Sequence, residues 1–309
     1  MLSKIPFEIP RSLIEKAKAA PRLPMAVAGA GHPVALESAK RAADAGLIEP
    51  VLIGEPHAIR HIARELGWDI AGLRLVPADD ETKAAEAAVA LARGGEVASI
   101  MKGHVHTDAL MRAVLKRDIG LRTDRRTSHV FHMTVPGHDD ALLIADAVVN
   151  VQPTVDDKIH IIQNAVDLAH ALGNPLPKVA ILSGAETVNP SMPSSVEAAE
   201  AVKRANDGAI VGAVVDGPLG FDNAVSPEAA RIKGIESPVA GQADILIVPN
   251  LEAGNFLFKQ MVYFMSAVAA GLVMGAKVPI VLTSRADPPE ARLAAAAIAA
   301  IVAGTKKTG

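Results

Sequence analysis

The chain has 309 residues, half of them hydrophobic, with a formal net charge of −3 and no cysteine. This length allows two domains, and so apolar a composition can bury a sizeable core. The weak negative charge and an aromatic content of 3% argue against nucleic acid as a partner. Without cysteine the chain has no disulfide framework, thiolate metal site or cysteine nucleophile, so any reacting thiol must belong to the substrate.

Short apolar runs alternate with amphipathic segments through the first 117 residues. Strands are predicted at 25–30, 50–56, 73–77 and 97–103, and helices at 32–46, 57–67, 80–95 and 107–117. Strands this apolar, alternating with helices, indicate a parallel sheet that helices cover on both faces.

The middle of the chain breaks this pattern and then resumes it. Residues 127–136 and 140–150 read as two strands joined by a Pro-Gly-His-Asp turn, which predicts an antiparallel hairpin. Strand–helix alternation returns afterwards. The break near 122–130 and the return to the earlier pattern after Gly271 predict one domain interrupted by another. We expect a discontinuous α/β domain of residues 1–130 plus 274–309 and an inserted α/β domain of residues 131–273.

Neither a signal peptide nor a membrane span is expected. The N-terminal residues lack the apolar core of a signal peptide. The longest apolar stretch, 261–276, is shorter than a typical span and rich in Ala, Gly and Ser, so we expect a buried helix there. The sequence therefore predicts a soluble, cytoplasmic protein without membrane contact.

Polar residues gather after the predicted strands, where ligands bind in open parallel sheets. Two of these stretches are weak sequence signals for a bound cofactor. His104 and His106 could ligate a metal, but no carboxylate stands at ligand spacing. The segment 29–34, GAGHPV, hints at a dinucleotide loop but lacks the third glycine.

The stretch after the last predicted strand, Thr283 to Glu290, carries the strongest signal. Asp287, two prolines and Glu290 have the form of a helix start, with an acidic N-cap and a glutamate three residues on. Ser284 and Arg285 are not needed for that start. An arginine at the mouth of a parallel sheet suits a phosphate, which it can grip with two hydrogen bonds, although a solvated arginine is the alternative.

Several stretches together resemble one enzyme family in order and spacing. They are MKGHVHTDALMRAVL (101–115), PGHDDALLIADAVVNVQP (136–153), DGPLGFDNAV (216–225), ADILIVPNLEAGNFLFKQ (243–260), VLTSRADPPE (281–290) and the segment 26–54. The chain resembles the phosphate acetyltransferase/phosphate butyryltransferase family, and looks closer to the butyryl-type branch. The resemblance implies a two-domain isocitrate/isopropylmalate-dehydrogenase-like α/β fold, with mostly parallel sheets flanked by helices and the active site in the interdomain cleft.

The resemblance also implies an activity. Members transfer an acetyl or short-chain acyl group such as butyryl reversibly between coenzyme A and inorganic phosphate, by direct thiolate attack in a ternary complex. Acyl-CoA, phosphate and acyl phosphate are then the small-molecule partners, coenzyme A is a substrate, no metal or nicotinamide is needed, and a homodimer or higher homo-oligomer is expected. The alternatives are a non-catalytic acyl-CoA-binding regulatory module of the same fold and a dehydrogenase of the same superfamily.

The resemblance assigns catalytic roles around the last strand. Ser284 would hydrogen-bond the reacting carbonyl or thiol, and Arg285 would hold the phosphoryl group. Acetyltransferase-type members carry an aspartate as the proposed base seven residues after the serine, where this chain has Ala291. The base would then be Glu290 or Asp287, or no carboxylate base exists and electrostatics alone lowers the pKa of the thiol.

Five further residues are implied as substrate contacts. Thr283 precedes the serine, and Arg112 matches a second substrate arginine. Arg125 or Arg126 stands where a third arginine is found, and the resemblance does not choose between them. Asn255, in the turn that opens a helix, is a candidate for a polar contact with substrate.

Overall fold

The computed structural model describes residues 2–138, 140–284 and 286–305. It divides into two compact units: the terminal unit, Ile9–Arg125 with Ala270–Gly309, and the middle unit, Met1–Glu8 with Arg126–Ala269. The units change over at 125/126 and 269/270, whereas the predicted boundaries were 130/131 and 273/274. Residues 2–8 lie in the middle unit, not with the segment that follows them. That each unit is an independent domain stays a prediction.

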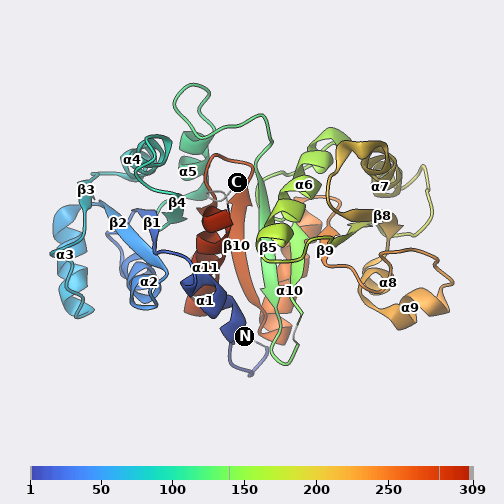
Figure 1. Ribbon diagram of the computed structural model, residues 1–309, viewed down its shortest axis with the longest axis horizontal. Coiled ribbons are helices and arrows are strands. Elements are labelled where there is room, and N and C mark those ends of the chain that lie inside the picture. The colour runs from blue at the N-terminus through green and yellow to red at the C-terminus, as the bar shows by residue number, and fades with distance from the viewer. Residues whose placement is uncertain (1, 139, 285, 306–309) are drawn as a thin grey trace. The chain divides into compact units, whose positions relative to one another are not determined.

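The terminal unit follows the predicted alternation of strands and helices (Figure 1). Its elements are α1 (Arg11–Lys18), β1 (Leu23–Ala28), α2 (Pro33–Asp44), β2 (Ile48–Gly54), α3 (Pro56–Glu65), β3 (Leu75–Pro77), α4 (Glu81–Arg93), β4 (Ser99–Lys102), α5 (Thr107–Val114), most of β10 (Val268–Met274), β11 (Ile280–Val281) and α11 (Pro289–Thr305).

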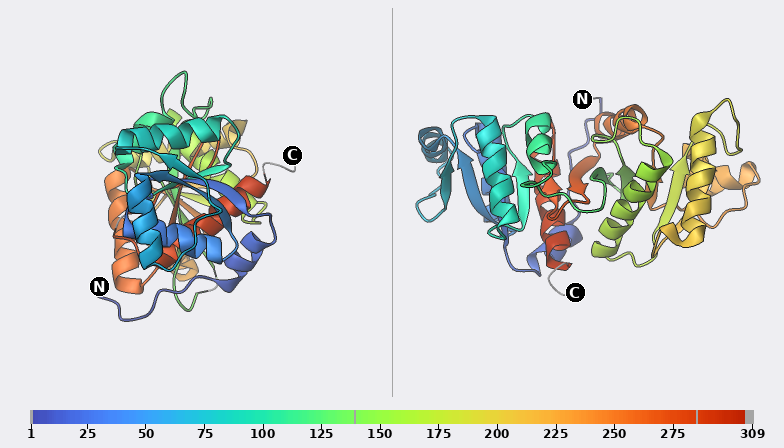
Figure 2. Two further views of the ribbon diagram at one scale, coloured as in Figure 1. Left: turned by 90° about the vertical axis from the view of Figure 1, so that its left-hand side faces the viewer. Right: turned by 90° about the horizontal axis from the view of Figure 1, so that it is seen from above.

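The strands of this unit are ordered β3-β2-β1-β4-β11-β10. Every pair is parallel except β10 with β11. Helices α4 and α5 pack together on one face of the sheet, and α2, α3, α1 and α11 lie on the other (Figures 1 and 2). The carboxyl ends of β1, β4 and β11 therefore meet at one edge of the sheet, where a ligand site is expected.

Two glycines allow the backbone segments that follow β1 and β4 to pass close to each other. Gly29 has a φ of 78°, and a Cβ there would lie 2.8 Å from the carbonyl oxygen of His104. A Cβ on Gly103 would lie 2.6 Å from the carbonyl oxygen of Ala28. Because the two exits touch through their backbones, Gly29 of the GAGHPV segment has a packing role that needs no dinucleotide.

The middle unit contains β5 (Ser128–Thr134), β6 (Leu142–Ala145), α6 (Val155–Ala171), β7 (Lys178–Leu182), α7 (Pro193–Arg204), a π-helical turn (Ala205–Ala209), β8 (Val214–Leu219), α8 (Phe221–Val225), α9 (Pro227–Ile232), β9 (Ile245–Ile247) and α10 (Leu251–Met265). Its strand order is β5-β6-β9-β7-β8. The predicted hairpin is confirmed, since β5 and β6 pair antiparallel, and the remaining pairs are parallel. Mostly parallel α/β sheets flanked by helices were predicted, and both units have them.

The prediction of one buried helix over 261–276 is wrong. Helix α10 ends at Met265, Ser266 adopts a left-handed φ of 52°, and β10 begins at Val268. The hydroxyl of Ser266 donates to the carbonyl oxygen of Ile5 at 2.6 Å, which fixes the reversal. A short apolar run without polar interruptions fits a buried strand as well as a buried helix. No helix in the described ranges is long and apolar enough to cross a membrane.

Candidate functional site

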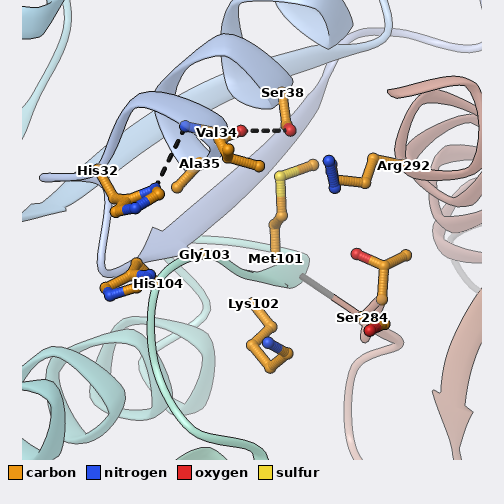
Figure 3. A pocket seen from close by; sticks show the side chains of 11 residues that line it. His32, Val34, Ala35, Ser38, Met101, Lys102, Gly103, His104, Ser284 and Arg292 are labelled. Carbon is orange, nitrogen blue, oxygen red and sulfur yellow. Dashed lines mark hydrogen bonds between the residues drawn. The ribbon is translucent and has the colours of Figure 1, made fainter. Parts of the chain in front are cut away.

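A pocket of about 260 Å³ lies in the terminal unit at the carboxyl ends of β4 and β11 (Figure 3). Strand β4 contributes its last residues and the turn that follows, helix α2 contributes residues of its first two turns, and helix α11 contributes one arginine. The lining residues are His32, Val34, Ala35, Ser38, Met101, Lys102, Gly103, His104, Thr283, Ser284 and Arg292. Two of the residues predicted from sequence, Thr283 and Ser284, are among them.

The loop that carries Ser284 is held by hydrogen bonds of its own. The Ser284 backbone N–H donates to the Oδ2 atom of Asp287 at 2.6 Å, and the backbone N–H of Asp287 donates to the Ser284 carbonyl oxygen at 3.2 Å. Thr283 is buried and Ser284 is exposed. The carboxylate of Asp287 therefore shapes the turn around the serine, beside the helix start that the sequence suggested. Arg285 lies outside the described residues.

Arg292 is the main residue of the pocket that the sequence did not single out. Its Nη1 donates to the carbonyl oxygen of Asp287 at 2.9 Å. Burial lowers the pKa of its guanidinium, and the carboxylates of Asp287, Glu37 and Glu290 counter that shift from nearby. The group stays charged, because arginine titrates far above neutral pH. One signal was present in the sequence, since Arg292 is the single Lys or Arg residue within the alanine-rich segment 289–305.

Lys102, His32 and His104 complete the polar side of the pocket. Lys102 is buried, and its Nζ donates to the carbonyl oxygen of Val105 at 3.3 Å. The rings of His32 and His104 stack with their centroids 4.0 Å apart and their planes at 5°. His32 also caps α2, because its Nδ1 accepts the backbone N–H of Val34 at 3.3 Å. In the sequence, His104 stood out only as a possible metal ligand of the HxH motif.

Glu290 stands on the first turn of α11, outside the pocket lining. Its Oε1 lies 3.6 Å from Nη1 of Arg41 on α2. The carboxylate is about one third exposed. Of the two carboxylates predicted as bases, Asp287 is thus bonded to the backbone of Ser284, and Glu290 forms an ion pair with a neighbouring helix.

The other predicted substrate contacts do not join this pocket. Arg112 is exposed on α5, and Arg125 lies at the end of the same unit's first segment. Arg126 belongs to the middle unit, where its guanidinium bonds Asn150 Oδ1 at 2.5 Å and Asp157 Oδ1 at 2.8 Å.

Asn255 also belongs to the middle unit, one turn into α10 and partly exposed. The N-cap of that helix is Asn250, whose side chain accepts the backbone N–H of Ala253 at 3.0 Å. Asn255 is therefore not needed to cap the helix, and its contact with substrate stays a prediction.

The two histidines of the HxH motif have different partners. His104 stacks on His32, whereas His106 bonds Glu81 Oε2 through its Nδ1 at 2.7 Å. Within the part of the chain that the structure describes, no cluster of three or more His, Asp or Glu side chains is placed to hold a metal ion.

Comparison with known proteins agrees with the resemblance seen in the sequence. A family model described as phosphate acetyl/butaryl transferase matches residues 79–300, well over half of the chain. Phosphate acetyltransferase of Rhizobium meliloti is 50% identical over 285 residues, which cover 91% of this chain and 90% of that protein. Phosphate butyryltransferase of Clostridium beijerinckii is 40% identical over 295 residues, which cover 96% and 98%.

A solved structure of a phosphotransacylase is also similar to this chain. A branched-chain phosphotransacylase from Enterococcus faecalis V583 matches with a TM-score of 0.80 and 34% identity, covering 91% of this chain and 99% of that one. The identity to the acetyltransferase exceeds the identity to the butyryltransferase. Overall identity therefore gives no support for a closer kinship with the butyryl-type branch.

Proposed function

The chain belongs to the phosphate acetyl/butyryltransferase family, and from this premise we propose that it transfers a short acyl group reversibly between coenzyme A and inorganic phosphate. In the direction of thioester synthesis, the coenzyme A thiolate attacks the carbonyl carbon of an acyl phosphate. The C–S bond forms, the bond between the carbonyl carbon and the phosphate oxygen breaks, and phosphate leaves with the electron pair. The enzyme forms no covalent intermediate.

One observation carries this proposal beyond family membership. Thr283 and Ser284 line a small pocket whose lining also includes two cationic side chains, Lys102 and Arg292. The reaction needs cations against the phosphoryl group and a donor for the oxyanion that develops on the carbonyl. In the proposed reaction the hydroxyl of Ser284 donates to that oxygen or to the thiol, and Arg285 supplies a guanidinium for the phosphoryl group.

The proton acceptor, if the reaction uses one, is Asp287 or Glu290. A free thiol has a pKa of about 8.5, so a base or a positive field must help to form the thiolate at neutral pH. The position where acetyltransferase-type relatives place an aspartate is alanine in this chain, Ala291, so it holds no acid. We favour a structural role for Asp287, because its carboxylate already accepts the amide of Ser284.

Arg112, Arg125 or Arg126, and Asn255 are proposed as further substrate contacts on the strength of the family motifs. Arg126 bonds Asn150 and Asp157, and the choice between the two adjacent arginines stays open. The location of the active site between two domains, and the dehydrogenase-like arrangement that goes with it, stay predictions. No nicotinamide or metal takes part in the proposed reaction, and turnover should survive exhaustive EDTA treatment.

A homo-oligomer is proposed from an exposed apolar surface on α10. Phe256 and Phe264 are each 64% exposed there, and Tyr263 and Met265 are also exposed, in a chain with few aromatic residues. A second copy of the chain would remove this surface from water. Phe264→Lys should then lower the mass measured by light scattering without lowering the thermal midpoint of unfolding of the monomer. A cytoplasmic location stays the expectation from the sequence.

The proposed function is tested by turnover with a series of acyl phosphates from acetyl to longer chains. Thioester formation should depend on both coenzyme A and the acyl phosphate. Ser284→Ala should lower kcat at least tenfold, because it removes the proposed donor, whereas Ser12→Ala, at an exposed position of α1, should not. A chain that binds acyl-CoA tightly but forms no product with any member of the series would be a regulatory module instead.

A further inference from the structure

Arg292 has donors that the protein itself does not satisfy. Its Nη1 is bonded to the Asp287 carbonyl oxygen, but its Nε is buried and has no hydrogen-bond partner among the residues described. The nearby carboxylates of Glu37 and Glu290 act on it only at longer range, and Glu290 is instead paired with Arg41. A buried charged donor without an acceptor is unfavourable, so a ligand that supplies one gains binding energy.

The geometry of the guanidinium selects the kind of ligand. The bond from Nη1 to Asp287 uses one edge of the group, which leaves the edge formed by Nε and Nη2. That edge donates two parallel hydrogen bonds and matches the oxygens of a phosphate or a carboxylate. In Figure 3 the end of the Arg292 side chain points toward Met101 inside the pocket. The flexible side chain of Met101 can yield to an entering group.

The remaining walls favour an anion of small size. The lining contains Lys102 and two histidines together with Ser38, Thr283 and Ser284, and it includes no aspartate or glutamate among the described residues. Its volume of about 260 Å³ falls slightly below the usual range of roughly 300–1,000 Å³ for small-molecule pockets. A phosphate with a short acyl chain suits such a space, whereas a whole coenzyme A molecule does not.

We propose that Arg292 binds the phosphoryl group of the acyl phosphate, or inorganic phosphate in the reverse direction, through Nε and Nη2. This inference rests on the proposed function and adds a residue that the family motifs did not point to. The same side chain also positions Ser284, because Nη1 holds Asp287 and Asp287 holds the amide of Ser284. Occupation of the pocket by phosphate and the placement of the serine are thereby linked through one arginine.

The first test uses steady-state kinetics of Arg292→Gln and Arg292→Lys, with Arg93→Gln at an exposed position of α4 as the matched control. Arg292→Gln should raise KM for phosphate and for acyl phosphate roughly tenfold to a hundredfold and leave KM for coenzyme A within twofold. Arg292→Lys should fall between, because lysine keeps the charge but not the paired donors. Arg93→Gln should match the wild type.

A second measurement needs no variant. Phenylglyoxal modifies accessible arginines of the wild-type enzyme, and peptide mass spectrometry reports the extent at each site. Inorganic phosphate should protect Arg292 and leave Arg93 unprotected, whereas sodium chloride at the same ionic strength should protect neither.

The outcomes separate this inference from the function on which it rests. If the wild type forms no thioester, the proposed function fails. If it is active but Arg292→Gln keeps its KM for phosphate, or phosphate gives Arg292 no protection, the role of Arg292 is wrong and the function stands. A rise in KM for coenzyme A alone would assign the arginine to a phosphate of coenzyme A and would overturn the proposal.

Discussion

Replacing Asp287 separates a structural role of its carboxylate from a role as proton acceptor. Oδ2 accepts the Ser284 amide at 2.6 Å. A hydrogen bond to a charged group contributes roughly 1.5–3 kcal/mol, and we take the lower end because the side chain is partly exposed. In Asp287→Ala this hydrogen bond is lost and Ser284 is displaced. If the whole hydrogen-bond energy is thereby lost from the transition state, kcat should fall about tenfold, since about 1.4 kcal/mol is a factor of ten.

Asp287→Asn keeps an acceptor oxygen in nearly the same place, so it should retain at least about a third of the wild-type kcat. A general base predicts the opposite pattern, with Asn as damaging as Ala, a loss of about 10²–10⁴-fold, and recovery as the pH passes the thiol pKa of about 8.5. We would measure kcat from pH 6.5 to 9.5 for both variants and for Glu290→Gln, at a temperature where circular dichroism finds all of them folded. A loss of two decades in Asp287→Asn that high pH relieves would refute the structural role.

Three further predictions concern stability. Gly103→Ala should lower the free energy of unfolding by roughly 1–3 kcal/mol in urea titrations, because the new Cβ would meet a backbone oxygen at 2.6 Å, while Gly72→Ala, with open space around it, should have little effect. Burial lowers the pKa of His132 from 6.5 to about 4, so the unfolded chain binds more protons between these values and stability falls as the pH drops through that window. At pH 5 this effect lowers the free energy of unfolding by about 2 kcal/mol relative to neutral pH. His132→Leu should therefore make the free energy of unfolding, measured with denaturant, depend less on pH between pH 7 and 4. Glu197→Gln should cost about 3 kcal/mol because it leaves the charge of Lys158, which is 1% exposed, without its partner at 2.5 Å, and double replacement with apolar residues should recover most of that loss.

The fold was largely predictable because its strands are short, apolar and separated by clear helical patterns. The hairpin of β5 and β6 followed from its turn residues. The end of α10 did not, since the chain reverses at Ser266 without a glycine or proline, and an uninterrupted apolar run gives no period to separate helix from strand.

The site was predictable only where a motif marked it. Thr283 and Ser284 were found from their place after a strand and from the family resemblance. Lys102 was missed because a lysine at the end of a strand signals nothing until the structure brings it to the pocket. Arg292 was missed because a single arginine in an alanine-rich helix does not show from the sequence which way its side chain points. Whether an exposed residue such as Arg112 reaches the substrate depends on where the fold places it, and the spacing of residues in the sequence does not give that position.

The central claim is most directly tested by the stoichiometry of a single reaction. Purified protein is mixed with butyryl-CoA, with and without inorganic phosphate, and free thiol and acyl phosphate are measured together over time. The account predicts that one thiol and one acyl phosphate appear for each butyryl-CoA consumed, only when phosphate is present, and that adding coenzyme A to the products reverses the change. Thiol release without phosphate, or without an equal amount of acyl phosphate, would contradict it.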